Sequence, residues 1–297
     1  MDDVDPGGAG GPDEIQRPEL PPGRVVELPG RGTTFVREIA GPPGAPTVLL
    51  LHGWTVTADL NWFTCYRRLG ERYHVLALDQ RGHGRGVRSR EPFTLEACAD
   101  DAAALCEALG IERCVAVGYS MGGTVAQLVW HRHPDLVDGM VLCSTGATFS
   151  ETRNEQVNFL GLTGLAALVR LAPERARQWM GEQYLARKGR AFEAWAFEEL
   201  SRHDLAGLLE AGRQIGRFSS ADWLGTIDVP TAVIVTMNDQ VVPVRRQLQL
   251  FEGIPTAVAY RVDGRHNAVV NNAETYVPTL LEACGYVAER GGLRRTA

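Results

Sequence analysis

The feature that most limits how this sequence can fold is a set of short apolar runs without polar alternation. Each run is bounded by polar residues, glycine or proline, which is typical of strands covered on both faces of a parallel sheet. Helical patterns lie between the runs, and the one over 94–110 begins at a threonine and ends at a glycine. We therefore predict the α/β class, with a mostly parallel central sheet flanked by helices. The runs are 47–51, 74–78, 114–117, 140–143 and 231–236.

A glycine-rich turn with a central serine follows the run 114–117. It reads Gly118-Tyr119-Ser120-Met121-Gly122-Gly123, and a helical pattern over 124–133 comes next. A strand that turns abruptly into a helix strains its corner residue, and small neighbours let other backbone pass closely. The serine then stands at a helix N-terminus, where partial positive charge favours a developing oxyanion. This context makes Ser120 the candidate nucleophile, although the bare pattern also fits a serine that caps a helix.

A serine nucleophile needs a base, and His266 is the best placed of the seven histidines. It follows the strand-like run 258–262 and precedes a C-terminal helical pattern, so it lies on a loop at the carboxyl edge of the sheet. His131 and His133 stand at the end of a helix before Pro134 and are expected to face solvent.

The base needs an orienting acid, and Asp239 follows the run 231–236 directly. The resulting chain order Ser, Asp, His is the one expected of this strand–turn–helix serine site. Asp228 precedes its strand, at the wrong end of the sheet, and Asp263 is a nearby competitor that could cap the turn carrying His266.

An oxyanion hole needs two backbone donors beside the serine. The run 47–51 is followed by His52-Gly53-Trp54, and the amides of Trp54 and Met121 fit this role. His52 is expected to be buried under this turn and to hold it by hydrogen bonds, without transferring a proton.

Taken together, these segments resemble the α/β-hydrolase superfamily over about residues 24–290. The resemblance rests on His52-Gly53-Trp54, the loop 79–84, the turn around Ser120, the pair Asp239 and Pro243, and His266-Asn267. It implies Ser120 as nucleophile, Asp239 as acid, His266 as base, and an α/β-hydrolase fold with an inserted helical cap. Arg265 departs from the small residue that many relatives carry before the histidine. Haloalkane dehalogenases and epoxide hydrolases carry an aspartate at the turn, so Ser120 argues against both.

The pattern along the chain divides it into regions. Residues 1–23 are acidic and rich in proline and glycine, and they predict a disordered arm. Residues 24–146 and 225–290 form the predicted core. Residues 147–224 contain helical patterns and no strand-like run, and they predict the helical cap. Residues 291–297 are expected to form a flexible tail.

Charge and composition restrict the partners and the compartment. The net charge is −6, of which residues 1–22 carry −5, so the remaining chain offers no basic surface to nucleic acid. No run approaches the roughly 18 apolar residues of a membrane span. The six cysteines form no C-x-x-C pair and favour a reduced, cytoplasmic chain. The oligomeric state stays open.

These residues predict a serine hydrolase acting on carboxylic esters or lactones of small to medium size, with a small-molecule acyl substrate. Neither a cofactor nor a metal is required, because the triad supplies the nucleophile and the base. Trp179, Trp195 and Trp223 could line an acyl pocket or simply form the core of the cap. Alternatives with the same residues are a carbon–carbon bond hydrolase, a perhydrolase or an acyltransferase. A ligand receptor on a hydrolase fold is the alternative from another class.

Overall fold

The computed structural model describes residues 17–294, except for 152, 174, 177–179 and 181–193. An eight-stranded sheet forms the centre, in the order β1-β2-β4-β3-β5-β6-β7-β8. Strands β1 and β2 pair antiparallel, β2 joins β4 antiparallel, and all further pairs are parallel. The strands are β1 (Gly23–Leu28), β2 (Gly32–Ile39), β3 (Thr47–Leu51), β4 (His74–Leu78), β5 (Cys114–Tyr119), β6 (Val137–Cys143), β7 (Thr231–Thr236) and β8 (Ala257–Val262).

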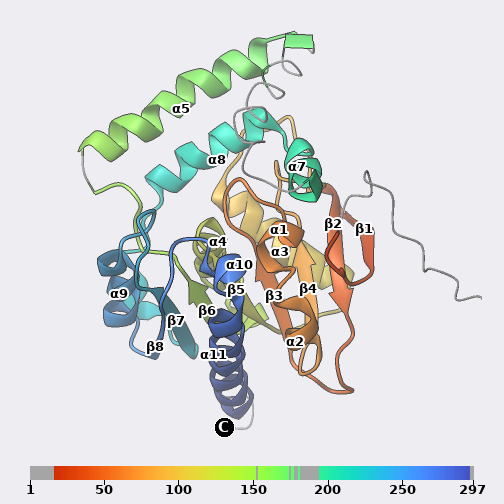
Figure 1. The fold of residues 1–297 in the computed structure, drawn as a ribbon, viewed down its shortest axis with the longest axis vertical. Coiled ribbons are helices and arrows are strands. Elements are labelled where there is room, and N and C mark those ends of the chain that lie inside the picture. Colours follow the sequence, from red (N-terminus) through yellow and green to blue (C-terminus); the bar gives the residue numbers. More distant parts are fainter. Residues whose placement is uncertain (1–16, 152, 174, 177–179, 181–193, 295–297) are drawn as a thin grey trace, which may run out of the picture.

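The predicted mostly parallel α/β sheet is confirmed, and its inner strands β3 to β7 are buried on both faces because helices cover both (Figure 1). Leu49 and Leu51 of β3 pack in one core with α3 (Leu95–Ala108), α4 (Met121–Arg132) and α9 (Val244–Gly253). Val48 and Leu50 point the other way, toward α2 (Tyr66–Gly70), α10 (Ala268–Asn271) and α11 (Ala273–Arg294). Side chains of successive strand residues alternate between faces, so a continuous apolar run serves two cores.

The helix predicted over 94–110 is α3. The side chain of Thr94 accepts a hydrogen bond from the amide of Ala97, which satisfies one of the free donors of the first turn. Gly110 follows the helix with a φ of +67°, a backbone conformation that favours glycine.

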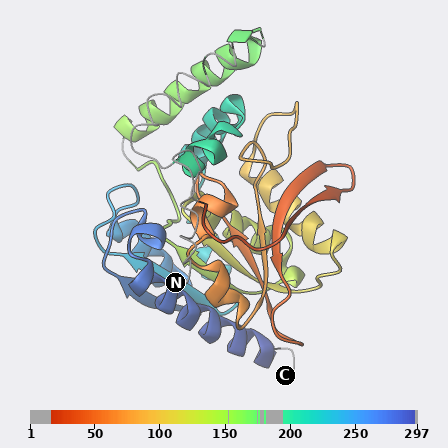
Figure 2. The same cartoon turned by 45° about the vertical axis from the view of Figure 1, so that its right-hand side comes forward.

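Three described helices lie together beyond one end of the sheet (Figures 1 and 2). They are α5 (Arg153–Leu171), α7 (Ala194–Ser201) and α8 (Leu205–Arg217), and α5 packs against α8. An antiparallel bridge between Thr148 and Ser219 joins the two ends of this region. The described helices fall within the span 147–224, and their role as a cap stays a prediction.

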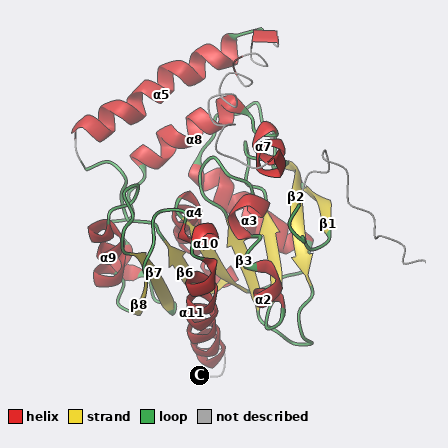
Figure 3. Cartoon of the chain, in the orientation of Figure 1, coloured by secondary structure: helices red, strands yellow, loops and turns green. Residues whose placement is uncertain are grey.

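The structure can be compared with the boundaries that we predicted at the two ends of the chain. Residues 1–16 of the predicted arm lie outside the described residues, and β1 begins at Gly23. Helix α11 continues to Arg294, four residues into the span 291–297 that we expected to be a tail (Figure 3). Within the described part of the chain, no helix combines the length and the apolar character needed to cross a membrane.

Candidate active site

Ser120 occupies the corner between β5 and α4, with φ +53° and ψ −115°. Its amide donates to the carbonyl of Cys143 on the neighbouring strand, at 2.9 Å. A Cβ at Gly122 would lie 2.0 Å from the carbonyl oxygen of Leu51, and one at Gly118 would lie 2.2 Å from that of Gly122. Only glycine fits such close backbone approaches, so both glycines are required by the corner itself.

Backbone strain is concentrated around this corner. Among the described residues, the non-glycine residues with positive φ are Thr55 (+63°), Ser120 (+53°) and Ser144 (+46°). They follow β3, β5 and β6, which are adjacent parallel strands, so all three lie at the same edge of the sheet. Strained residues persist only where the surroundings over-determine them, and they cluster at functional sites. This edge is therefore the candidate active site.

The structure brings His266 to Ser120. The imidazole Nε2 lies 3.1 Å from Ser120 Oγ, and Nδ1 lies 2.7 Å from Asp239 Oδ2. Because a carboxylate only accepts, Nδ1 carries the proton and donates it, which leaves Nε2 as an acceptor for the serine hydroxyl. The histidine side chain is 24% exposed, whereas the aspartate side chain is fully buried.

The carboxylate of Asp239 is held by further donors. Its Oδ1 accepts from the amides of Val241 and Val242, at 2.8 and 2.9 Å, and Gln247 Nε2 lies 3.4 Å from Oδ2. Hydrogen bonds from these donors compensate the carboxylate for its loss of water. They also direct Oδ2 toward His266.

The two predicted oxyanion donors belong to two segments that meet at the serine. Met121 follows Ser120 directly and begins α4. A Cβ built on Gly53 would lie 3.6 Å from Ser120 Cβ, so the turn that leads to Trp54 contacts the serine. The indole Nε1 of Trp54 donates to the carbonyl of Leu208 on α8, at 2.8 Å. The assignment of the two amides to an oxyanion hole stays a prediction.

His52 is fully buried under this turn, as predicted. The amide of Gln80 donates to its Nε2 at 2.9 Å, so its Nδ1 donates to the carbonyl of Gly53 at 2.7 Å. Burial lowers the pKa of His52 to about 3. A neutral histidine that is bonded on both nitrogens supports the turn, and that it transfers no proton stays a prediction.

The tryptophans of the predicted cap have separate surroundings. Trp195 is buried against Leu60 of α1 (Ala58–Trp62). The ring of Trp223 stacks on those of His131 and Trp130, at 4.5 and 6.1 Å between centroids, so it packs on the end of α4. Trp179 lies outside the described residues.

Two residues at the site had no signal in the sequence. Tyr119 donates from its hydroxyl to the carbonyl of His266 at 2.6 Å, and its ring contacts the imidazole edge to face. Asn61 accepts from the amide of Gly53 at 2.8 Å. Tyr119 and His266 meet only when the sheet forms, and the spacing of eight residues between Gly53 and Asn61 does not by itself predict a hydrogen bond.

Comparisons with known proteins place the chain in a family. A model of the alpha/beta hydrolase fold matches residues 46–273. The putative carbamate hydrolase RutD of Agrobacterium fabrum is 26% identical over 255 residues, which cover 80% of this chain and 92% of the relative. The non-heme chloroperoxidase of Streptomyces lividans is 31% identical over 224 residues, which cover 71% and 81%.

Solved structures share the fold at low identity. A thermophilic esterase from Thermogutta terrifontis is 23% identical with a TM-score of 0.68, over 88% of this chain and 97% of that one. The enol-lactonase of Burkholderia xenovorans is 22% identical with a TM-score of 0.70, over 87% and 98%. The match of the family model over most of the chain agrees with the sheet order and the serine corner, and the chain belongs to the alpha/beta hydrolase fold family.

Proposed function

We propose that this chain is a serine hydrolase that cleaves carboxylic ester or lactone bonds of small to medium substrates. The observation that carries the proposal is the continuous series of hydrogen bonds from Asp239 through His266 to Ser120. A serine hydroxyl is a weak nucleophile at neutral pH, and this arrangement is the known physical solution. Hydrolase, esterase and lactonase names among the similar proteins support the same class.

In the proposed reaction, Ser120 Oγ attacks the acyl carbon while His266 Nε2 takes the hydroxyl proton. The negative charge of Asp239 stabilises the imidazolium that results. The amides of Trp54 and Met121 donate to the carbonyl oxygen as it becomes negative. His266 then returns the proton to the leaving oxygen, and water activated by His266 releases the acid from Ser120.

Six free cysteines, all buried, support the reducing cytoplasmic compartment that we propose for this enzyme. Burial raises the pKa of Cys65 and Cys143 to about 12, so neither thiol competes with Ser120 as a nucleophile.

The test is hydrolysis of p-nitrophenyl esters, from acetate to long-chain acyl groups, by the wild type and by Ser120→Ala. Ser144→Ala is the matched control, because Ser144 is also buried and also has positive φ beside the same edge. We expect turnover to vanish in Ser120→Ala and to stay within about tenfold of wild type in Ser144→Ala. Equal turnover by the wild type and Ser120→Ala would contradict the proposal.

The perhydrolase and acyltransferase alternatives differ only in what attacks the acyl-enzyme. Adding hydrogen peroxide or a primary alcohol to the same assay separates them, because the acceptor that wins determines the product. Peracid or new ester formed faster than free acid would replace hydrolysis as the main reaction while keeping the same nucleophile.

A further inference from the structure

Asn61 is a buried carboxamide that contacts the turn beside Ser120. It lies on α1, eight residues after Gly53, and it is 4% exposed. Its Oδ1 accepts from the amide of Gly53 at 2.8 Å. This bond fixes the plane of the peptide that precedes Gly53, and with it the direction in which the turn continues toward Trp54.

The turn needs such support because it is strained. Thr55, one residue beyond Trp54, has a φ of +63°, which costs a residue with a Cβ about 1 kcal/mol or more. A hydrogen bond to a buried amide contributes a similar amount. The contact from Asn61 is therefore large enough to decide whether the turn keeps this conformation.

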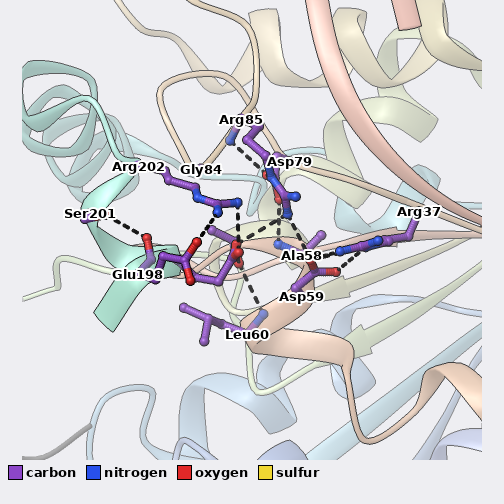
Figure 4. Close-up of polar contacts among 12 residues, drawn as sticks. Arg37, Ala58, Asp59, Leu60, Asp79, Gly84, Arg85, Glu198, Ser201 and Arg202 are labelled. Atoms are coloured by element: carbon purple, nitrogen blue, oxygen red, sulfur yellow. Dashed lines mark hydrogen bonds and ion pairs between the residues drawn. The ribbon is translucent and has the colours of Figure 1, made fainter. Parts of the chain in front are cut away.

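Helix α1 is itself fixed by buried ionic contacts (Figure 4). Asp79 Oδ1 accepts from the amide of Ala58 at the start of the helix, at 2.9 Å. Asp59 accepts from Arg37 and from Arg85, each at 2.8 Å, and its side chain has no exposure to solvent. A five-residue helix has little stability of its own, so these contacts hold Asn61 in position.

The Nδ2 end of the carboxamide makes no competing hydrogen bond within the described part of the chain. Asn61 Nδ2 is shielded from solvent and has no hydrogen-bond partner among the described residues. Buried polar groups are rarely kept with half of their bonding capacity unused. The contact of Oδ1 with Gly53 is what explains an asparagine at this place.

We propose that Asn61 is a positioning residue for the oxyanion side of the reaction, acting through the Gly53 peptide to direct the amide of Trp54 toward Ser120. This inference rests on the proposed serine hydrolase function. A misdirected amide would weaken the transition state and leave ground-state binding of the substrate largely unchanged.

The test compares kcat, KM and the affinity for an alkyl trifluoromethyl ketone. Ser120 Oγ adds to the carbonyl carbon of this probe, the electron pair of the C=O π bond moves to the oxygen, and the serine proton goes to His266. The adduct carries a negative oxygen like that of the transition state, so the affinity for the ketone reports the oxyanion contacts. Asn61→Leu removes the acceptor at similar volume. Thr231→Val is the control, because it deletes a buried hydrogen bond from a hydroxyl at the start of β7, the end of the strand away from Asp239.

For Asn61→Leu we expect kcat and ketone affinity to fall together by about tenfold to hundredfold, somewhat less than complete loss of one oxyanion donor. KM should stay within about threefold of the wild-type value. The concentration of active sites is measured by titration with a fluorophosphonate, and kcat is calculated per active site. Should the leucine variant not fold, Asn61→Ser provides the same test, since its hydroxyl is too short to reach the Gly53 amide.

Wild-type kcat and ketone affinity in a folded Asn61 variant would overturn the inference while leaving the hydrolase intact. A fall in kcat without a fall in ketone affinity would also overturn it. Ester turnover that is absent from the wild type, or unchanged in Ser120→Ala, would overturn the proposed function and this inference with it.

Discussion

The two sides of Ser120 are held in place by different kinds of contact. On the base side, Asp239 and His266 lie on loops after β7 and β8, and the carboxylate is bound by backbone amides and Gln247. Val241 in this loop is 63% exposed. On the other side, formed by the turn 51–55 and α1 and called the oxyanion side after the role we propose for it, the supports are the fully buried carboxylates of Asp59 and Asp79 with Arg37 and Arg85.

This difference follows the demands of the proposed reaction. The base has to gain and lose a proton and meet water, so partial exposure and neutral donors suit it. Oxyanion donors act only if they point correctly before the reaction begins. Buried ion pairs contribute little net stability but tolerate no rearrangement, since each unpaired charge is costly.

The largest predicted effect breaks the base side. Asp239→Asn keeps the shape of the side chain but can donate to His266 Nδ1, which favours the wrong tautomer. We expect kcat for ester hydrolysis to fall about 10⁴-fold, equivalent to roughly 5 kcal/mol of transition-state stabilisation. Steady-state kinetics beside an unchanged thermal unfolding midpoint would check this, and a loss below tenfold would contradict the role of Asp239.

The next effect breaks the oxyanion side. Asp59→Asn removes the carboxylate that pairs with the mostly buried Arg37, whereas Arg85 keeps its ion pairs with Asp79 and Glu199. We expect a cost of about 3 kcal/mol of unfolding free energy. Asp100→Asn is the matched control, because Asp100 pairs with Arg132 at the surface, where such pairs contribute about 1 kcal/mol or less. Urea unfolding measures both, and equal losses would contradict the contrast between the two sides.

The sequence predicted the elements whose signals are local. The runs 47–51, 74–78 and 231–236 coincide with β3, β4 and β7 because a strand covered on both faces needs unbroken apolar residues. Ser120, Asp239 and His266 were selected by the glycine turn and by their order at strand ends, and the structure brings their side chains within hydrogen-bond distance. Their catalytic roles remain proposals.

Contacts between distant segments could not be predicted in this way. The ion pair of Asp59 with Arg37 joins helix α1 to strand β2, and these become neighbours only through the order β2-β4-β3. From the sequence, Trp223 could line an acyl pocket or form the core of the cap. Only the fold shows that its ring stacks on that of His131. Asn61 is only eight residues from Gly53, but the sequence does not show that the chain between them turns so that the two form a hydrogen bond.

The pH dependence of the unfolding free energy is a further test of the contrast between the two sides, because two buried histidines lie beneath the oxyanion side. Burial lowers the pKa of His52 and of His83 to about 3 from an ordinary value of 6.5. Between these values the unfolded chain binds more protons than the folded one, so the free energy of unfolding falls as pH drops below 6.5.

Each histidine is expected to contribute a loss of about 2 kcal/mol between pH 6.5 and pH 5. Urea unfolding at pH 7 and pH 5 measures the sum, and His83→Gln should lose about 2 kcal/mol less than the wild type over this range. Parallel pH dependence in the two proteins would show that His83 does not stay neutral in the folded state.

The smallest predicted effect concerns Tyr119, which joins the serine corner to the base loop. Tyr119→Phe removes the hydrogen bond to the carbonyl of His266 and keeps the ring. We expect a loss of about 1 kcal/mol in unfolding free energy and a fall in kcat of less than tenfold. An effect as large as that of Asp239→Asn would mean that the base loop depends on this one bond.

The proposed reaction depends on Ser120 being a nucleophile that His266 activates. The most direct measurement is the rate and site of covalent labelling by a fluorophosphonate, followed by mass spectrometry of the intact chain and its peptides. We expect one label per chain, on Ser120, with labelling slowed about 10³-fold or more in His266→Ala. Labelling at another residue, or at an unchanged rate in His266→Ala, would contradict it.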